Sequence, residues 1–140
     1  MKIGFTGTRF DVTPLQREKL TEVLQELKKT HHEFHHGGCY GADVTARDIA
    51  ISLKIPTICH PGSAWQYQNS MHIDEKTHMI YPFLERDIMI VEATDILVAI
   101  PRLMKEEKRS GTWTTVRAAR KRNKPVIICW PDGSITKERT

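Results

Sequence analysis

Short apolar runs alternate with amphipathic stretches along the whole chain, and this alternation limits the fold more than any other feature. Five runs, at residues 3–6, 33–36, 55–60, 95–100 and 125–130, are typical of buried strands. Four stretches, beginning near residues 14, 42, 83 and 112, carry apolar side chains at helical spacing. The order predicts an α/β fold: a Rossmann-like, mostly parallel sheet of about five strands with helices on both faces.

The clearest helix signal opens the first amphipathic stretch. Thr13 is a good N-cap, Pro14 suits the first helical position, and Gln16 completes a capping box. One face of this helix is expected to be apolar, formed by Leu15, Leu20, Val23, Leu24 and Leu27. Residues 61–82 show no clear period, which indicates either a functional loop or a missed element.

Length and composition narrow the class of protein. The 140 residues, 39% hydrophobic and 27% charged, suit one globular domain over 1–140. The charge of +4 favours phosphate-bearing partners only mildly. No apolar run approaches the roughly 20 residues of a membrane span, and the N-terminus reaches glycine too soon for a signal peptide. Three widely spaced cysteines favour a reduced protein, so we expect a cytoplasmic one without membrane contact.

Glycines stand where predicted strands lead into helices. They fall in 4–9, in 37–43 and at 110–112, three junctions expected at one edge of a parallel sheet. Exposed backbone N–H groups and helix dipoles there would bind an anion. The plainer interpretation, that each tight turn simply needs glycine, is favoured for any one junction. Neither the dinucleotide motif GxGxxG nor the P-loop is present, which argues against NAD binding and ATP hydrolysis.

Several side chains near these turns have both a functional and a structural interpretation. Arg9 is a phosphate or carboxylate clamp or a solvated loop residue. Asp43 is an acceptor for a ribose hydroxyl or an acid that stabilises the start of a helix. Cys39 is more simply a turn thiol than a nucleophile. His36, just before the diglycine, is the histidine expected to face the cleft.

Other clusters favour structural roles. The segment 31–36 contains two histidine pairs at i, i+4, but it runs into a predicted strand and lacks further ligands, so no metal site is predicted. The basic stretch from Arg117 to Lys124 is expected to be a solvated helix face, with nucleic-acid binding as the alternative. The aromatic residues Trp65, Tyr67 and Trp113 could either stack on a base or pack in the interior.

Four motifs together resemble the SLOG superfamily, which joins the Smf/DprA DNA-processing proteins with the LOG phosphoribohydrolases. They are GFTGTR at 4–9, HGGCYGAD at 36–43, ATDILVAIP at 93–101 and SGTW at 110–113. The resemblance spans roughly residues 3–133. It implies a Rossmann-like domain that binds a nucleotide or a nucleotide-derived ligand, commonly as a homodimer or larger oligomer.

The hydrolase motif of this superfamily can be compared with this sequence residue by residue. The hydrolase motif PGGxGTxxE is matched by Gly111 and Thr112, and Arg86 is placed for the upstream arginine. The motif's diglycine falls on residues 108–109, and its catalytic glutamate falls on Thr115. A threonine cannot stabilise an oxocarbenium-like transition state or activate water. Asp43, Glu85, Glu106 and Glu107 are alternative carboxylates, and the charged segment 102–109 is either a flap or an oligomer contact.

The predicted function is binding of a nucleotide or nucleotide-derived small molecule, for sensing or sequestration. An N-glycoside hydrolase or transferase acting on nucleoside 5′-monophosphates is the alternative, and single-stranded DNA binding is favoured less. No cofactor is predicted, and Asp43 and Arg86 are the weak catalytic candidates. The predicted ligand-binding residues are Gly7, Thr8, Arg9, His36, Gly37, Gly38, Gly41, Ala42, Asp43, Arg86, Pro101, Ser110, Gly111 and Thr112.

Overall fold

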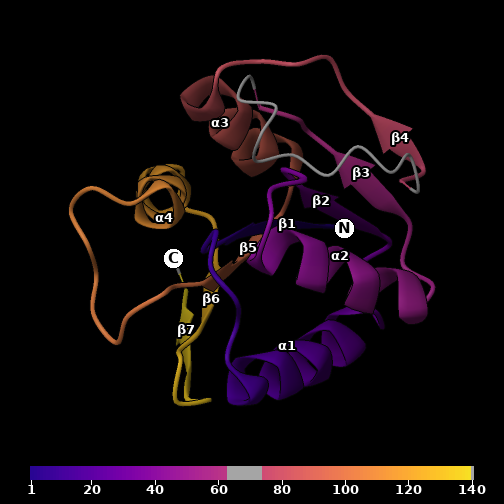
Figure 1. Cartoon of the computed structure of the whole chain (residues 1–140). Helices are drawn as coiled ribbons and strands as arrows, with labels where there is room; N and C mark the ends of the chain where they lie inside the picture. Colours follow the sequence, from indigo (N-terminus) through magenta and orange to yellow (C-terminus); the bar gives the residue numbers. More distant parts are fainter. Residues whose placement is uncertain (63–73, 140) are drawn as a thin grey trace.

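A computed structural model describes residues 1–62 and 74–139 and contains one seven-stranded sheet (Figure 1). The strands are β1 (Lys2–Gly7), β2 (Glu33–His36), β3 (Thr57–Cys59), β4 (Lys76–Thr77), β5 (Ile96–Ile100), β6 (Val126–Cys129) and β7 (Ile135–Glu138). The helices are α1 (Pro14–Leu27), α2 (Ala42–Ser52), α3 (Phe83–Ala93) and α4 (Gly111–Lys121). The α/β, mostly parallel architecture predicted from the sequence is confirmed.

The sheet has two strands more than the predicted five. Its order is β4-β3-β2-β1-β5-β6-β7, and every neighbouring pair is parallel except β6 with β7. β4 has only two exposed residues, and β7 is an edge strand with exposed side chains. Neither strand therefore carries the apolar run by which buried strands are recognised.

Two helices cover each face of the sheet. α1 and α2 lie on one side, and α3 and α4 lie on the other (Figure 1). β5 is paired on both edges and buried along most of its length, as its continuous apolar run predicts. Of the helices in the described part of the chain, none is long and apolar enough to cross a membrane.

The start of α1 follows its predicted signals, and Leu20, Val23 and Leu24 are buried as predicted, but the first position of the predicted apolar face is not. The Thr13 and Gln16 side chains form the expected capping box. Leu15, predicted to be buried, is 48% exposed, whereas Gln16 is buried. The Gln16 side-chain amide donates to the carbonyl of Pro101 at 2.8 Å and to that of Cys129 at 3.2 Å. A polar residue thus takes the inward position because two strand-end carbonyls need donors there.

The strand order places a topological switch beside β1. From β1 the chain adds β2, β3 and β4 in one direction, and α3 then returns it to β5 on the other side of β1. The connections after β1 and β5 therefore diverge at the carboxyl ends of these strands. Such a point opens a crevice in which ligands of α/β proteins commonly bind.

Candidate functional site

A cavity of about 480 Å³ lies at this switch point, above the carboxyl ends of β1 and β5. Its lower wall comes from β1 and the glycine turn after β2, and α3 covers one side. The connection from β5 to α4 and the first residues of α4 form another part of the wall. Nine predicted ligand-binding residues line it: Gly7, Thr8, Arg9, Gly37, Asp43, Arg86, Ser110, Gly111 and Thr112.

The other five predicted residues lie outside the cavity lining and support the turns around it. The His36 imidazole is completely buried, and its Nδ1 accepts a hydrogen bond from the N–H of Gly38. The carbonyl of Pro101 accepts from Gln16, and the N–H of Ala42 donates to the carbonyl of Thr8 at 3.0 Å. Gly41 has a φ of +86°.

Gly41 fixes the path of the neighbouring loop. A Cβ at this position would lie 2.5 Å from the backbone of Arg9, so the two chain segments touch directly. With its positive φ, this position strongly favours glycine, both for conformation and for space. The first and second glycine turns are therefore packed against each other as one rigid unit.

Asp43 and Arg86 hold the second glycine turn from its two sides. Asp43 Oδ2 accepts hydrogen bonds from the N–H groups of Gly37, at 3.0 Å, and Cys39, at 3.3 Å. Arg86 Nη1 donates to the carbonyl of Gly37 at 2.8 Å and to that of His60 at 3.1 Å. Its Nε donates to Asp87 at 2.7 Å. The contacts of both catalytic candidates therefore hold the turn in place, which is a structural role.

Burial controls the charge state of these groups. It raises the pKa of the Asp43 carboxyl, an effect that nearby Arg86 and His36 partly offset. It also raises the pKa of Asp87, again against the pull of Arg86. Burial raises the pKa of the Cys39 thiol to about 11, so this cavity residue is protonated at neutral pH and is a poor nucleophile.

The start of α4 forms part of the cavity wall. Ser110 is the N-cap, and its hydroxyl accepts from the N–H of Trp113 at 3.3 Å. A Cβ placed on Gly111 would meet nothing within 4 Å, so open space lies directly above this helix terminus. A helix N-terminus that faces a cavity favours a negatively charged group.

The connection between β5 and α4 forms a cavity wall, which we call the 102–109 segment. Arg117 of α4 holds it by donating to Glu106 Oε2 and to the carbonyls of Glu107 and Lys108. Arg102, Glu107 and Arg109 of this segment line the cavity. The sequence indicated a flap or an oligomer contact here, because nothing in its charges showed that a helix arginine would fix it.

Sequence reasoning missed most of the apolar and charged walls. Apart from the 102–109 segment, the missed lining residues are Phe5, Thr6, Phe10, Cys39, Phe83, Asp87 and Ile90. The β1 residues Phe5 and Thr6 belong to a strand already predicted to end at the site, which was a usable signal. Phe10, which is 60% exposed, carried no periodic signal.

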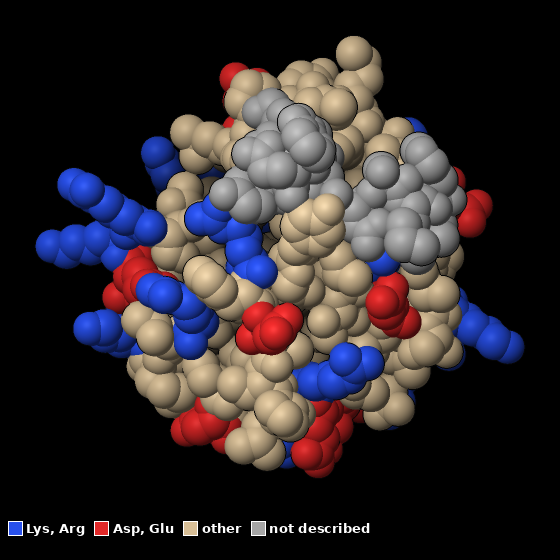
Figure 2. Space-filling view, viewed as in Figure 1, with Lys and Arg blue, Asp and Glu red and all other residues tan. Residues whose placement is uncertain are grey.

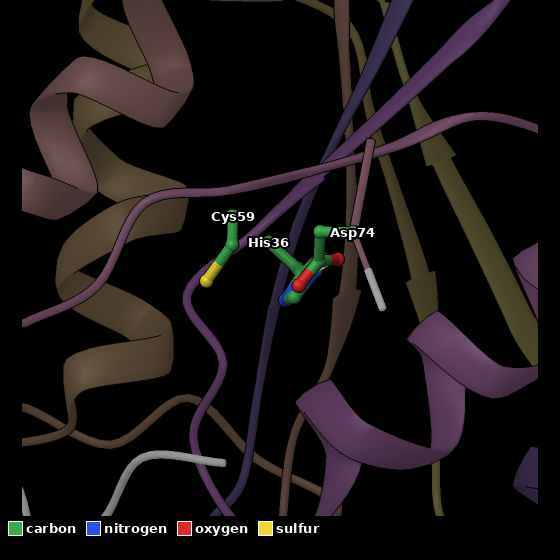
Figure 3. Close-up of side chains that lie close together, drawn as sticks. All are labelled: His36, Cys59 and Asp74. Atoms are coloured by element: carbon green, nitrogen blue, oxygen red, sulfur yellow. Dashed lines mark hydrogen bonds and ion pairs between the residues drawn. The ribbon is translucent and has the colours of Figure 1, made fainter. Parts of the chain in front are cut away.

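One group of side chains in the described residues has the composition of a metal site. His36, Cys59 and Asp74 bring one potential ligand atom each to within 4.8 Å of one another (Figure 3). His36 and Cys59 are register partners on β2 and β3, and Asp74 precedes β4. However, His36 Nδ1 accepts from Gly38, so Nε2 carries the proton and donates to Asp74 at 2.6 Å. Both imidazole nitrogens are thus already engaged in holding the turn.

The chain matches no protein-family model and no curated protein significantly. Among solved structures it resembles TM1055, with a TM-score of 0.66 and 16% identity over 90% of this chain and 72% of that one. The chain has the SLOG fold.

Two further structures with this fold have stated ligands. DNA processing protein A from Helicobacter pylori, described for its single-stranded DNA binding, has a TM-score of 0.64 and 21% identity. The match covers 91% of this chain and 64% of that protein. The molybdenum cofactor binding protein from Rippkaea orientalis has a TM-score of 0.64 and 20% identity, over 93% and 77% of the two chains. At these identities the likeness shows the fold alone.

On α4, no carboxylate stands at the position that the resemblance assigns to the catalytic glutamate of the hydrolases. Thr115, which stands there, is completely buried and donates its hydroxyl to the carbonyl of Gly111 at 2.9 Å. It also acts against the rise that burial causes in the pKa of the Asp87 carboxyl of α3. The carboxylates that line the cavity are Asp43, Asp87 and Glu107.

The basic stretch late in α4 is largely committed to ion pairs. Arg120 pairs with Glu106 at 2.9 Å and Glu138 at 2.7 Å, and Arg117 pairs with Glu106. Figure 2 shows blue basic side chains at the left, over α4 and the segment before it, with red acidic atoms among them. Lys124 instead caps α3, donating to the carbonyls of Val91 and Thr94.

Of the three aromatic residues considered for stacking on a base, one lies in the described part of the chain. Trp113 is 1% exposed and packs against Trp130, with ring centroids 5.7 Å apart, so it is a core residue. Trp65 and Tyr67 lie outside the described residues. Neither Trp113 nor Trp130 lines the cavity described above.

Proposed function

We propose that this protein binds a nucleotide or a nucleotide-derived small molecule in the cavity at the switch point. One observation carries the proposal: the lining of this cavity divides into the start of α4 with basic side chains and a set of apolar side chains. A cavity of about 480 Å³ is within the usual range for small-molecule sites, roughly 300–1,000 Å³. A phosphate bonded to a flat, largely apolar ring system fits such a division.

The anion-binding end is built from α4 and basic side chains. Backbone N–H groups at Gly111 and Thr112 belong to the first turn of α4, which contains no acidic residue. Arg9 and Arg109 also line the cavity and add positive charge. The apolar part of the lining consists of Phe5, Phe10, Phe83 and Ile90.

The structural neighbours support ligand binding in general terms. One binds the molybdenum cofactor and another binds single-stranded DNA. Because this chain spans only 64% of the DNA-binding neighbour, that protein's whole activity does not transfer with the fold.

The test measures binding by titration calorimetry. AMP, GMP, CMP and UMP are compared with their nucleosides, and at least one monophosphate is expected to bind at least tenfold more tightly than its nucleoside. Gly111→Glu should abolish this preference, since its carboxylate would stand at the helix terminus. The same acid favours α4 electrostatically, so the fold is retained. Arg17→Gln on exposed α1 is the charge-matched control and should bind like the wild type.

Two outcomes would overturn the proposal. In the first, no monophosphate binds at millimolar concentration. In the second, Gly111→Glu and the wild type bind a monophosphate equally well, which would place the ligand elsewhere on the protein.

An N-glycosidase is the second candidate function, favoured by the Asp87 carboxylate in the cavity wall. Hydrolysis of a nucleoside monophosphate would break the C1′–N bond, with water supplying the hydroxyl to C1′ and a proton to the departing base. Chromatography of protein incubated with each monophosphate detects free base. Base release by the wild type that is lost in Asp87→Asn would favour the enzyme over the pure binding protein.

Single-stranded DNA binding stays the third candidate. It would need the basic side chains of α4, most of which are paired with acids. Affinity for an oligonucleotide that fell steeply with salt would support it. Affinity unchanged between low and moderate salt would eliminate it.

A homodimer or larger homo-oligomer is proposed as well. Support comes from the exposed apolar side chains of Met79, Ile80 and Leu84, at 77%, 63% and 59% exposure. Sedimentation equilibrium of the wild type and of Ile80→Lys tests it: the wild type should be dimeric and the variant monomeric.

A further inference from the structure

We propose that Phe10 and Arg102 form a stacking site for a planar heteroaromatic ring, at the mouth of the cavity. The inference rests on the proposed function and narrows it, because it requires the ligand to carry a nucleobase-like ring besides its phosphate. Neither residue belongs to the glycine turns or to the start of α4. Both line the cavity that contains these elements.

Phe10 is an exposed aromatic side chain on a rigidly held backbone. Its N–H donates to the Thr8 hydroxyl at 3.1 Å, and its carbonyl packs directly above Gly41. Thr8 in turn donates its N–H to the carbonyl of Ile100 at 3.0 Å. The ring nevertheless remains 60% exposed. An aromatic ring fixed in place but left uncovered beside a cavity is suited to receive a second flat group.

Arg102 lies over the Phe10 ring and comes from the connection between β5 and α4. Its guanidinium carbon is 5.4 Å from the ring centroid. Nη2 also donates to Glu107 Oε1 at 2.9 Å. Glu107 is held through its own carbonyl by Arg117. The connection after β1 and the 102–109 segment thus meet at the cavity through the cation–π contact between Phe10 and Arg102.

The spacing shows how a ring would enter. Stacked atoms lie about 3.5–4.0 Å apart, so a ring between Phe10 and Arg102 would need about twice that separation. The present 5.4 Å is too short. Arg102 must therefore lift from Phe10 and close over the ligand ring. This movement is inexpensive because the Arg102 side chain is 49% exposed and its ion pair with Glu107 is solvated.

The ligand ring would then be held by stacking on the Phe10 ring and by a cation–π contact with Arg102. Aromatic stacking tolerates different bases, because every base has a π-face. The phosphate would lie at the start of α4 and the ring at Phe10, so the ligand spans the cavity from one end to the mouth. Ribose 5-phosphate, which lacks the ring, would keep the first contact and lose the second.

The experiment compares AMP, GMP, CMP and UMP with ribose 5-phosphate by titration calorimetry. The tightest monophosphate should bind the wild type about tenfold more tightly than ribose 5-phosphate does. Phe10→Ala should remove this advantage without changing the affinity for ribose 5-phosphate, and Phe10→Tyr should restore it. Arg102→Ala should reduce the advantage severalfold. Leu15→Ala, at an exposed apolar residue of α1 outside the cavity lining, is the matched control.

The failures of the two proposals are distinguishable. Equal affinities of the wild type for the monophosphates and ribose 5-phosphate would overturn the stacking site and leave phosphate binding intact. An equal loss of both ligands in Phe10→Ala would also overturn it, since Phe10 would then merely shape the wall. Binding of neither ligand by the wild type would overturn both proposals.

Discussion

Asp43 and Arg86 hold the two peptide groups of a single residue, Gly37. Asp43 accepts a hydrogen bond from its N–H at 3.0 Å, and Arg86 donates one to its carbonyl at 2.8 Å. The acid comes from the first turn of α2 and the base from α3, which lie on opposite faces of the sheet. The glycine turn after β2 is therefore fixed from both layers before any ligand arrives.

Arg86→Lys tests this structural role. A lysine ammonium cannot replace the guanidinium fork that reaches Gly37, His60 and Asp87 together, so buried carbonyls would lose their donors. We expect the free energy of unfolding in urea to fall by about 3 kcal/mol. Arg17→Lys, on the exposed side of α1, should change it by less than about 0.5 kcal/mol. Unchanged stability together with lost nucleotide binding would make Arg86 a ligand contact instead.

Two glycines that line the cavity, Gly37 and Gly111, should differ sharply in their tolerance of alanine. A Cβ on Gly37 would overlap the Arg86 guanidinium, whereas one on Gly111 meets no atom within 4 Å. Gly37→Ala should therefore lower the unfolding free energy by about 2 kcal/mol or more. Gly111→Ala should leave it unchanged or raise it by up to about 1 kcal/mol, since alanine favours a helix. Urea melts of both variants decide, and similar losses would contradict the geometry.

The sequence predicted the fold and one edge of the site because both depend on local patterns. The apolar run at 95–100 identified β5, and the capping box at Thr13 and Gln16 identified the start of α1. Glycines at strand ends marked the turns that meet at the switch point, since parallel strands share their carboxyl edge. The roles of individual residues at that edge were not accessible in this way.

What the sequence could not supply depends on contacts between distant residues. Gln16 is buried because the carbonyls of Pro101 and Cys129 meet it, and neither lies near it in sequence. The same holds for Arg117, which fixes the 102–109 segment. β4 and β7 carry no apolar run because they are short or exposed. Phe10 has no periodic neighbours, and its importance comes from the cavity beside it.

Three stacked imidazoles, from His35 on β2, His60 directly after β3 and His78 directly after β4, make the fold sensitive to acid. His60 lies 4.3 Å from His78 between ring centroids, and its Nε2 shares a 2.8 Å hydrogen bond with His35 Nδ1. Burial, together with the neighbouring histidines, lowers the pKa of His60 to about 3. Burial also lowers the pKa values of His35 and His78. The folded protein therefore favours the neutral form of these three imidazoles.

Stability should therefore fall as the pH drops below the ordinary histidine pKa. His60 binds a proton near pH 6.5 when unfolded but only near pH 3 when folded, so its contribution is present above pH 6.5 and is lost between these values. It accounts for about 1.4 kcal/mol between pH 7.5 and 5.5. Thermal melts at both values should show a smaller difference in His60→Phe than in the wild type. His32→Gln, at an exposed histidine, should keep the wild-type difference.

The last prediction concerns Arg117, which does not line the cavity but holds the 102–109 segment that does. Arg117→Gln should loosen this wall and lower the affinity for the tightest-binding monophosphate about threefold to tenfold. Stability should fall by about 1 kcal/mol at most, because the ion pair with Glu106 is half exposed. Trypsin provides a readout without ligand, since Lys105, Lys108 and Arg109 are exposed cleavage sites in the segment.

Arg122→Gln is the matched control for this variant. It removes the same charge at the end of the same helix, but Arg122 pairs with Glu92 at 3.7 Å and donates to the carbonyl of Ala118. We expect cleavage within the 102–109 segment to be faster in Arg117→Gln than in Arg122→Gln, and nucleotide affinity to fall only in the former. Equal cleavage rates would mean that the wall keeps its place without Arg117. In that case a drop in affinity would have to come from lost charge, and added salt would weaken the wild type to the same degree.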